Sequence, residues 1–91
     1  AAERKRAADR RQQLAPLKKQ LQQAETRVAA LEKERAKLKE SLADPALYGK
    51  GVSRLLDLQK QLGVVERDLA LAESQWLDLQ ERWETAEKEA V

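Results

Sequence analysis

The 91-residue sequence contains no Cys, His, Met or Phe, and it has only two Pro and three Gly. The absence of Cys excludes disulfide bonds, and the absence of both Cys and His removes the usual zinc ligands, general bases and nucleophiles. No stretch approaches the roughly 18 apolar residues that a membrane-spanning helix needs. We therefore expect a cytoplasmic chain that is not an enzyme, that holds no metal and no cofactor, and that does not enter a membrane.

The residues that are present are typical of long helices. Leu, Ala and Val supply most of the apolar content, aromatic residues amount to 3%, and 37% of the residues are charged. Ala, Leu, Arg, Lys, Gln and Glu are strong helix formers. The net charge of +2 is uneven: residues 1–11, 12–32 and 33–60 carry +3, +1 and +3, whereas residues 61–91 carry −5. The basic first part should attract the acidic end if the two lie side by side.

Apolar residues recur in alternating steps of three and four, which is the pattern of the contact seam of a supercoiled helix. A first run is apolar at eight of nine positions, with Arg35 as the exception, and a second run is apolar at all eleven. We therefore predict an all-α fold with helices over residues 14–42 and 52–90. The first seam is Leu14, Leu17, Leu21, Ala24, Val28, Leu31, Arg35, Leu38 and Leu42, and the second is Leu55, Leu58, Leu62, Val65, Leu69, Ala72, Trp76, Leu79, Trp83, Ala86 and Ala90.

The connection over residues 43–51 predicts a tight reversal of the chain. Asp44 is a good N-cap and Pro45 a good first helical residue, which favours a single helical turn before two glycines that permit the reversal. So short a connection makes the helices antiparallel neighbours. Leu47 and Tyr48 should fold over the open end of the seam. The prediction is a two-helix antiparallel coiled-coil hairpin, monomeric because each helix has its partner in the same chain.

The register of the two helices can be predicted from charge. Facing positions whose numbers sum to 93 bring Arg27 near Asp68 and Leu31 opposite Leu62. Each charge contact contributes only a few tenths of a kcal/mol, and they favour this register narrowly. The alternative register, with a sum of 100, faces three acidic pairs, which are Glu25–Glu73, Glu32–Glu66 and Glu34–Asp68.

Pro16 lies inside the first periodic run, where it removes a backbone hydrogen bond and crowds the carbonyl four residues before it. The helix therefore either begins near Pro16 or kinks there and continues back to Arg11. Further upstream, the positions that would continue the seam are weakly apolar or charged, namely Glu3, Ala7 and Arg10. We predict that residues 1–13 form a basic linker or arm, helical only part of the time, and that residues 14–91 form the hairpin.

Two groups of basic residues are candidate contacts for the phosphates of RNA or DNA. For the first group the alternative is a solvated linker, and for the second it is the ordinary charged surface of a helix. The candidates are Arg4, Lys5, Arg6, Arg10 and Arg11 in the arm, and Lys33, Lys37, Lys39, Lys50 and Arg54 near the tip of the hairpin.

Two seam residues invite a second interpretation. Trp76 and Trp83 lie seven residues apart on one face and could anchor a partner helix, but seam positions favour a place in the core. Arg35 is expected to extend its charge past the seam into solvent rather than to mark a partner site.

Several elements spread along the chain point to one family. They are Leu14-Ala15-Pro16-Leu17-Lys18-Lys19, Leu31-Glu32-Lys33-Glu34, Leu42-Ala43-Asp44-Pro45-Ala46-Leu47-Tyr48 and Arg82-Trp83-Glu84. In these elements the chain resembles the C-terminal coiled-coil domain of ABC-F ATP-binding cassette proteins. The upstream Lys5-Arg6…Arg10-Arg11 run is similar to the linker after the second ATPase domain, especially in the YheS-like and Uup-like branches.

The resemblance implies a chain tethered to ATPase domains, although none of the family's nucleotide-binding motifs occur in these residues. It also implies a role at the ribosome and in translation, with DNA as the target in the Uup-like branch. We therefore predict a non-catalytic appendage that binds ribosomal RNA or DNA. Because residues 61–91 are acidic, the nucleic acid would meet the arm, the first helix or the tip. The alternative is a structural spacer or a protein–protein interaction coiled coil.

Overall fold

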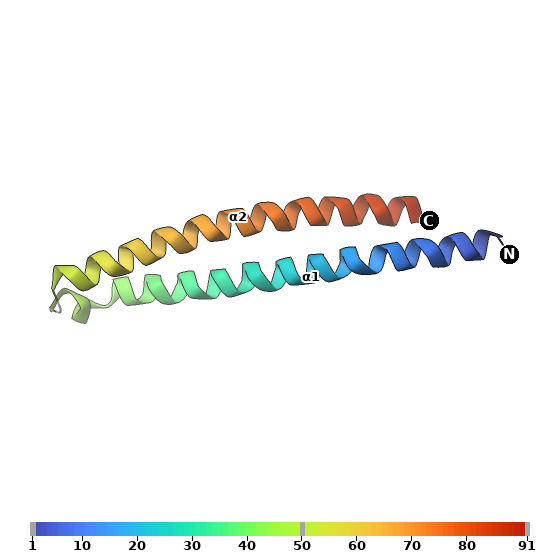
Figure 1. The fold of residues 1–91 in the computed structure, drawn as a ribbon. Coiled ribbons are helices and arrows are strands. Elements are labelled where there is room, and N and C mark those ends of the chain that lie inside the picture. Colours follow the sequence, from blue (N-terminus) through green and yellow to red (C-terminus); the bar gives the residue numbers. More distant parts are fainter. Residues whose placement is uncertain (1, 50, 91) are drawn as a thin grey trace.

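The computed structural model describes residues 2–49 and 51–90, and it forms an antiparallel hairpin of two long helices (Figure 1). Helix α1 extends over Ala2–Ala43, a short 3-10 helix η1 over Pro45–Gly49, and helix α2 over Val52–Ala90. The hairpin measures 73 × 15 × 14 Å. No strand occurs within the described residues. The predicted all-α helical hairpin is thus confirmed.

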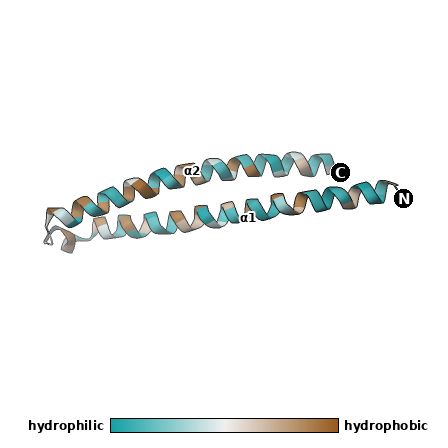
Figure 2. Ribbon diagram, in the orientation of Figure 1, coloured by the Kyte–Doolittle hydropathy of each residue, from teal (hydrophilic) through white to brown (hydrophobic). Residues whose placement is uncertain are grey.

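The core is a single line of apolar side chains between the helices. Figure 2 shows hydrophobic and hydrophilic residues alternating along the ribbons of both helices. All but one of the buried residues occupy predicted seam positions, and the other described seam positions are half-buried. Arg35 is among the half-buried residues, and so are both tryptophans, as expected for members of the seam. The buried residues are Leu21, Leu31, Leu38, Leu47, Leu58, Val65, Leu69 and Ala72.

The register differs from the prediction by about one heptad. Arg10 contacts Glu89 and Glu25 contacts Trp76, so that facing residue numbers sum to 99 and 101 rather than 93. The physical reason lies at the tip, where Leu47 joins the buried cluster of the two helices and is only 5% exposed. Burial of one leucine contributes about 2 kcal/mol, which exceeds the few tenths of a kcal/mol of each surface charge contact.

The turn forms as the sequence predicts. The amide of Ala46 donates to Oδ1 of Asp44 at 3.0 Å, and the amide of Leu47 donates to the Asp44 carbonyl at 3.1 Å. Gly51 alone among the described residues has a positive φ, at 92°, and therefore carries the reversal. Leu47 covers the end of the seam as predicted, but Tyr48 does not, since it is 70% exposed.

Helix α1 begins at Ala2, whereas the sequence pattern predicted a first helix from residue 14, and it passes through Pro16 without a break. Pro16 is exposed. The carbonyl that loses its partner to the proline, that of Gln12, also belongs to an exposed residue, so water can satisfy it. The upstream residues are mostly Ala, Arg, Lys and Gln, which favour helix even where no partner helix covers them.

Candidate nucleic-acid interface

The basic arm is the first part of α1, and it projects beyond the end of α2 (Figure 1). In the observed register, residue 10 stands opposite the last residues of α2, so that residues 2–9 have no facing helix. Arg4, Lys5 and Arg6 are all exposed there. Because they follow one another directly, these three side chains point in different directions around the helix. Their positive charge is therefore spread around more than half of the helix rather than gathered in a flat patch.

Arg10 holds a different position from the other arm residues. Its guanidinium Nη1 donates to the backbone carbonyl of Glu89 at 2.9 Å. That carbonyl lies in the last turn of α2, where carbonyl groups lack a partner in their own helix and carry partial negative charge. Arg10 thus caps α2, and only its remaining donors face solvent. Sequence reasoning missed this role because it depends on the register.

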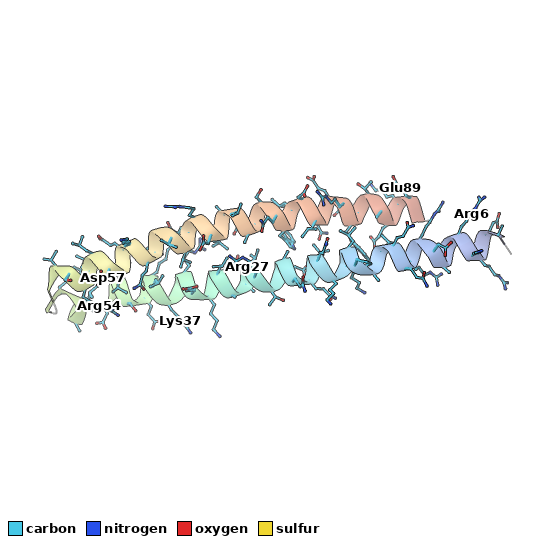
Figure 3. All side chains as sticks on the ribbon, viewed as in Figure 1. Arg6, Arg27, Lys37, Arg54, Asp57 and Glu89 are labelled. Atoms are coloured by element: carbon cyan, nitrogen blue, oxygen red, sulfur yellow. The ribbon has the colours of Figure 1, made fainter. Side chains whose placement is uncertain are left out.

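The second basic group lies near the tip. Lys33, Lys37 and Lys39 on α1 and Arg54 at the start of α2 are all exposed. Lys33 and Lys37 are one helical turn apart and so share a face of α1. Figure 3 shows Lys37 on the side of α1 that points away from α2. The predicted candidate Lys50 lies outside the described residues.

The two basic groups do not form one site. At about 1.5 Å per residue, Arg10 and Lys37 are separated by about 40 Å along α1. This separation is several times the Debye length of about 8 Å at physiological ionic strength, so the groups act as independent sites. A nucleic acid that touches both would have to run along most of the rod.

The acidic end of the chain is not neutralised by the basic one. Among residues 2–49 and 51–90 there is one ion pair, between Nη2 of Arg82 and Oδ2 of Asp78 at 3.1 Å, and it lies within α2. Both side chains are more than half exposed, so this pair contributes little to stability. The expected attraction between the two ends of the sequence therefore forms no ion pair between the described parts of the helices. Apolar contacts hold the hairpin together.

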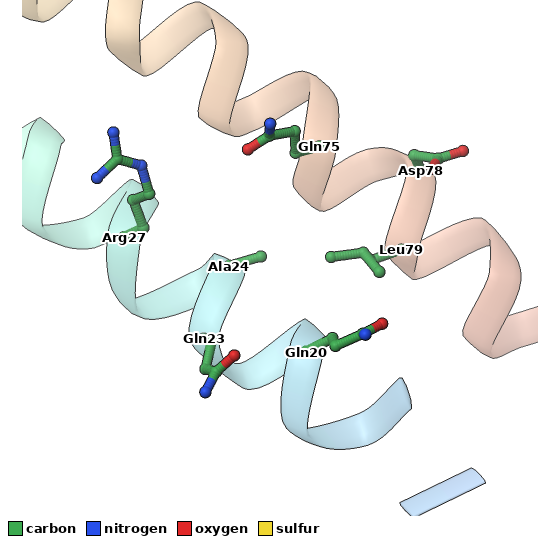
Figure 4. Close-up of a pocket in the computed structure, with 7 residues that line it drawn as sticks. All are labelled: Gln20, Gln23, Ala24, Arg27, Gln75, Asp78 and Leu79. Atoms are coloured by element: carbon green, nitrogen blue, oxygen red, sulfur yellow. The ribbon is translucent and has the colours of Figure 1, made fainter. Parts of the chain in front are cut away.

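Shallow hollows open between the helices where small residues interrupt the seam. One has a volume of about 420 Å³, and in Figure 4 Ala24 and Leu79 point toward each other from the two helices that border it. The other lining residues are all polar, and the single carboxylate among them, that of Asp78, is in an ion pair with Arg82. They are Gln20, Gln23, Arg27, Gln75 and Asp78.

Two further properties of the described residues bear on function. No group of three or more acidic side chains comes close enough to hold a metal ion. Neither long helix has an apolar stretch of the length and hydropathy that crossing a bilayer requires.

The chain matches a known protein family. The family described as "ABC transporter C-terminal domain" matches residues 14–88. No curated protein matches the chain, and no solved structure matches it. The matched range covers the turn and both seams except Ala90, and it leaves out the whole basic arm, residues 1–13.

Proposed function

Because this chain belongs to the ABC transporter C-terminal domain family, we propose that it is the nucleic-acid-binding appendage of an ABC-F ATPase that works in translation. Its target would be ribosomal RNA or DNA, and its ATPase domains would lie elsewhere in the parent protein. The family places the hairpin in an ABC protein, and the ABC-F branch rests on the sequence elements described above. The proposal includes a cytoplasmic location and a monomeric hairpin.

One observation carries the proposal: every candidate basic residue within the described part of the chain is exposed, and none of them is in an ion pair there. Nine of the ten lie in that part. An exposed Lys or Arg without a carboxylate partner can exchange its counterions for a phosphate, which is the main source of affinity for nucleic acids. Because the −5 charge of residues 61–91 repels phosphate, the nucleic acid would contact the arm and the tip.

A spacer or a protein-interaction coiled coil is the second candidate. It is favoured by the shape, since a rod 73 Å long and about 15 Å across can hold two bodies apart without binding anything along its length. Lack of affinity for nucleic acid in the following test would support this function and overturn the first.

The test is a titration of labelled RNA and DNA with three variants that lose equal charge. The arm variant is Arg4→Gln/Lys5→Gln/Arg6→Gln, and the tip variant is Lys33→Gln/Lys37→Gln/Lys39→Gln. The matched control, Lys18→Gln/Lys19→Gln/Arg27→Gln, removes three exposed charges between the two groups.

We expect the arm or the tip variant to bind at least about 10-fold more weakly than the control at roughly 50 mM salt. Its salt dependence should flatten by about one unit of log–log slope for each lost phosphate contact. Equal weakening in all three variants would show that only net charge matters. No binding by the unmodified chain at 50 mM salt would remove nucleic acid as a target of this hairpin.

A further inference from the structure

A second groove between the helices differs in chemistry from the basic surface. It has a volume of about 450 Å³ and lies near the middle of the rod. Four of its lining residues are apolar and the other three are glutamates, with no Lys or Arg among them. The lining residues are Val28, Ala29, Trp76 and Leu77, and Glu25, Glu32 and Glu73.

The floor of this groove is an incompletely covered apolar surface. Val28 and Trp76 come from the seam and are half-buried, whereas Leu77 lies beside the seam and is 54% exposed. The indole Nε1 of Trp76 donates to Oε1 of Glu25 at 3.4 Å, which ties the ring to the opposite helix as one wall of the groove. Tryptophan is enriched among the residues that carry most of the binding energy in protein interfaces, and the exposed Leu77 adds apolar area beside it.

The rim of the groove carries negative charge that the hairpin does not neutralise. Within residues 2–49 and 51–90, no Lys or Arg forms an ion pair with Glu25, Glu32 or Glu73. Like charges on facing helices are unfavourable by a few tenths of a kcal/mol for each contact. These carboxylates do not gather closely enough to hold a metal ion. The rim is therefore complementary to cationic side chains rather than to a bound ion.

We propose that this groove binds a cationic amphipathic helix of a partner protein. Its apolar side chain would lie against Trp76 and Leu77, and its Lys or Arg residues would pair with the glutamates of the rim. Glu25 and Glu32 are two helical turns apart, about 10 Å. The fitting segment therefore has two basic residues seven positions apart with an apolar anchor midway between them, which is the helix-in-groove mode of recognition. Phosphate is repelled by the same rim, so this site is separate from the nucleic-acid surface.

The test uses a labelled alanine-based helical peptide in which two Lys residues stand seven positions apart with two Leu residues midway between them. The first pair of variants tests the rim. Glu25→Gln/Glu73→Gln removes two charges from the groove, and Glu40→Gln/Glu84→Gln removes two from exposed positions elsewhere. We expect at least about 10-fold weaker peptide binding in the first and less than about 2-fold in the second. Loss of like-charge contacts should leave the groove variant folded.

The second pair tests the floor. Leu77→Ala removes an exposed leucine that lines the groove, and Leu71→Ala removes one, 60% exposed, that does not. Weaker peptide binding in the Leu77 variant alone supports the proposal. Equal effects within either pair, or no binding of the peptide at low salt, would overturn it. So would a hairpin that dimerises in sedimentation experiments and becomes monomeric in Glu25→Gln/Glu73→Gln, because a second copy would then be the occupant.

Discussion

The half of the hairpin near the tip buries its seam more completely than the half near the termini, although both follow the same spacing of apolar residues. Among the described residues of α1 none before Leu21 is buried, and among those of α2 none after Ala72 is buried. Toward the tip, Leu58 and Leu69 are only 3% and 2% exposed.

The difference follows from the sizes of the facing side chains. Near the tip most of the facing seam residues are leucines and valines, and Leu47 closes the end of the line. In the other half Trp76 and Trp83 alternate with Leu79 and Ala86, and a groove opens beside Trp76. Spacing therefore decides which residues face the partner helix, whereas matching of volumes decides how far each is buried. The less closely packed half carries the groove for which we propose a partner.

The largest expected effect is at the centre of the seam. Leu31→Ala should lower the free energy of unfolding by about 2–4 kcal/mol, because it leaves a cavity among buried neighbours. Leu14→Ala, at a half-buried position in the looser half, should lower it by about 1 kcal/mol, and the exposed control Gln22→Ala by less than about 0.5 kcal/mol. Urea denaturation followed by circular dichroism measures all three. Similar losses for Leu31 and Leu14 would contradict the comparison between the two halves.

The closure of the tip can be tested separately. Leu47→Ala should lower the free energy of unfolding by about 2–3 kcal/mol, because Leu47 is buried against both helices. Its neighbour Tyr48 is exposed, so Tyr48→Ala should change stability by less than about 0.5 kcal/mol. The same denaturation measurement applies. If the tyrosine variant lost as much stability as the leucine variant, Leu47 would not be the residue that closes the end of the seam.

Replacement of two glycines by alanine should change the stability of the hairpin in opposite directions. Gly63 lies inside α2, and a Cβ added there meets nothing within 4 Å, so Gly63→Ala should stabilise the hairpin by about 1 kcal/mol. Gly51 has a φ of 92°, so Gly51→Ala should destabilise it by about 1 kcal/mol or more. Thermal melting resolves shifts of this size. A loss of stability in Gly63→Ala would mean that a close neighbour occupies this face of α2.

The smallest effect is expected at the open end. Arg10→Ala should lower stability by about 0.5–1 kcal/mol, because the last turn of α2 loses the cation on the Glu89 carbonyl. The adjacent exposed Arg11→Ala serves as the control. Hydrogen exchange should show faster exchange in the last turns of α2 for the Arg10 variant only. Unchanged exchange in both variants would show that Arg10 does not cap the helix in solution.

Much of the fold could be predicted from the sequence because the seam spacing is a local property of each helix. Leu21, Leu58 and Leu69 are buried at predicted seam positions, and Asp44 begins the short helix of the turn as predicted. Exposure of the basic candidates also follows from their positions off the seam. Arg10 is also exposed, but unlike the others it lies on the upstream continuation of the seam and contacts α2.

The parts that sequence reasoning missed all depend on how one helix stands against the other. The sum of 93 was chosen from surface charges such as Arg27 and Asp68, and each of these contacts contributes less free energy than the burial of Leu47 at the tip. The observed register brings Glu25 beside Trp76 and Glu73 and creates the acidic groove. It also leaves residues 2–9 without a facing helix.

The sequence by itself thus determined the all-α hairpin, the identity of the seam and the chemistry of the turn, because periodicity, helix propensity and capping act within a few residues. Only the tertiary structure decided the register, and with it the capping role of Arg10, the exposed arm and the groove beside Trp76. A coiled-coil seam can slide by a heptad and keep apolar residues facing one another. The choice among such registers depends on the fit of side chains from distant parts of the chain, here Leu47 against the ends of both helices.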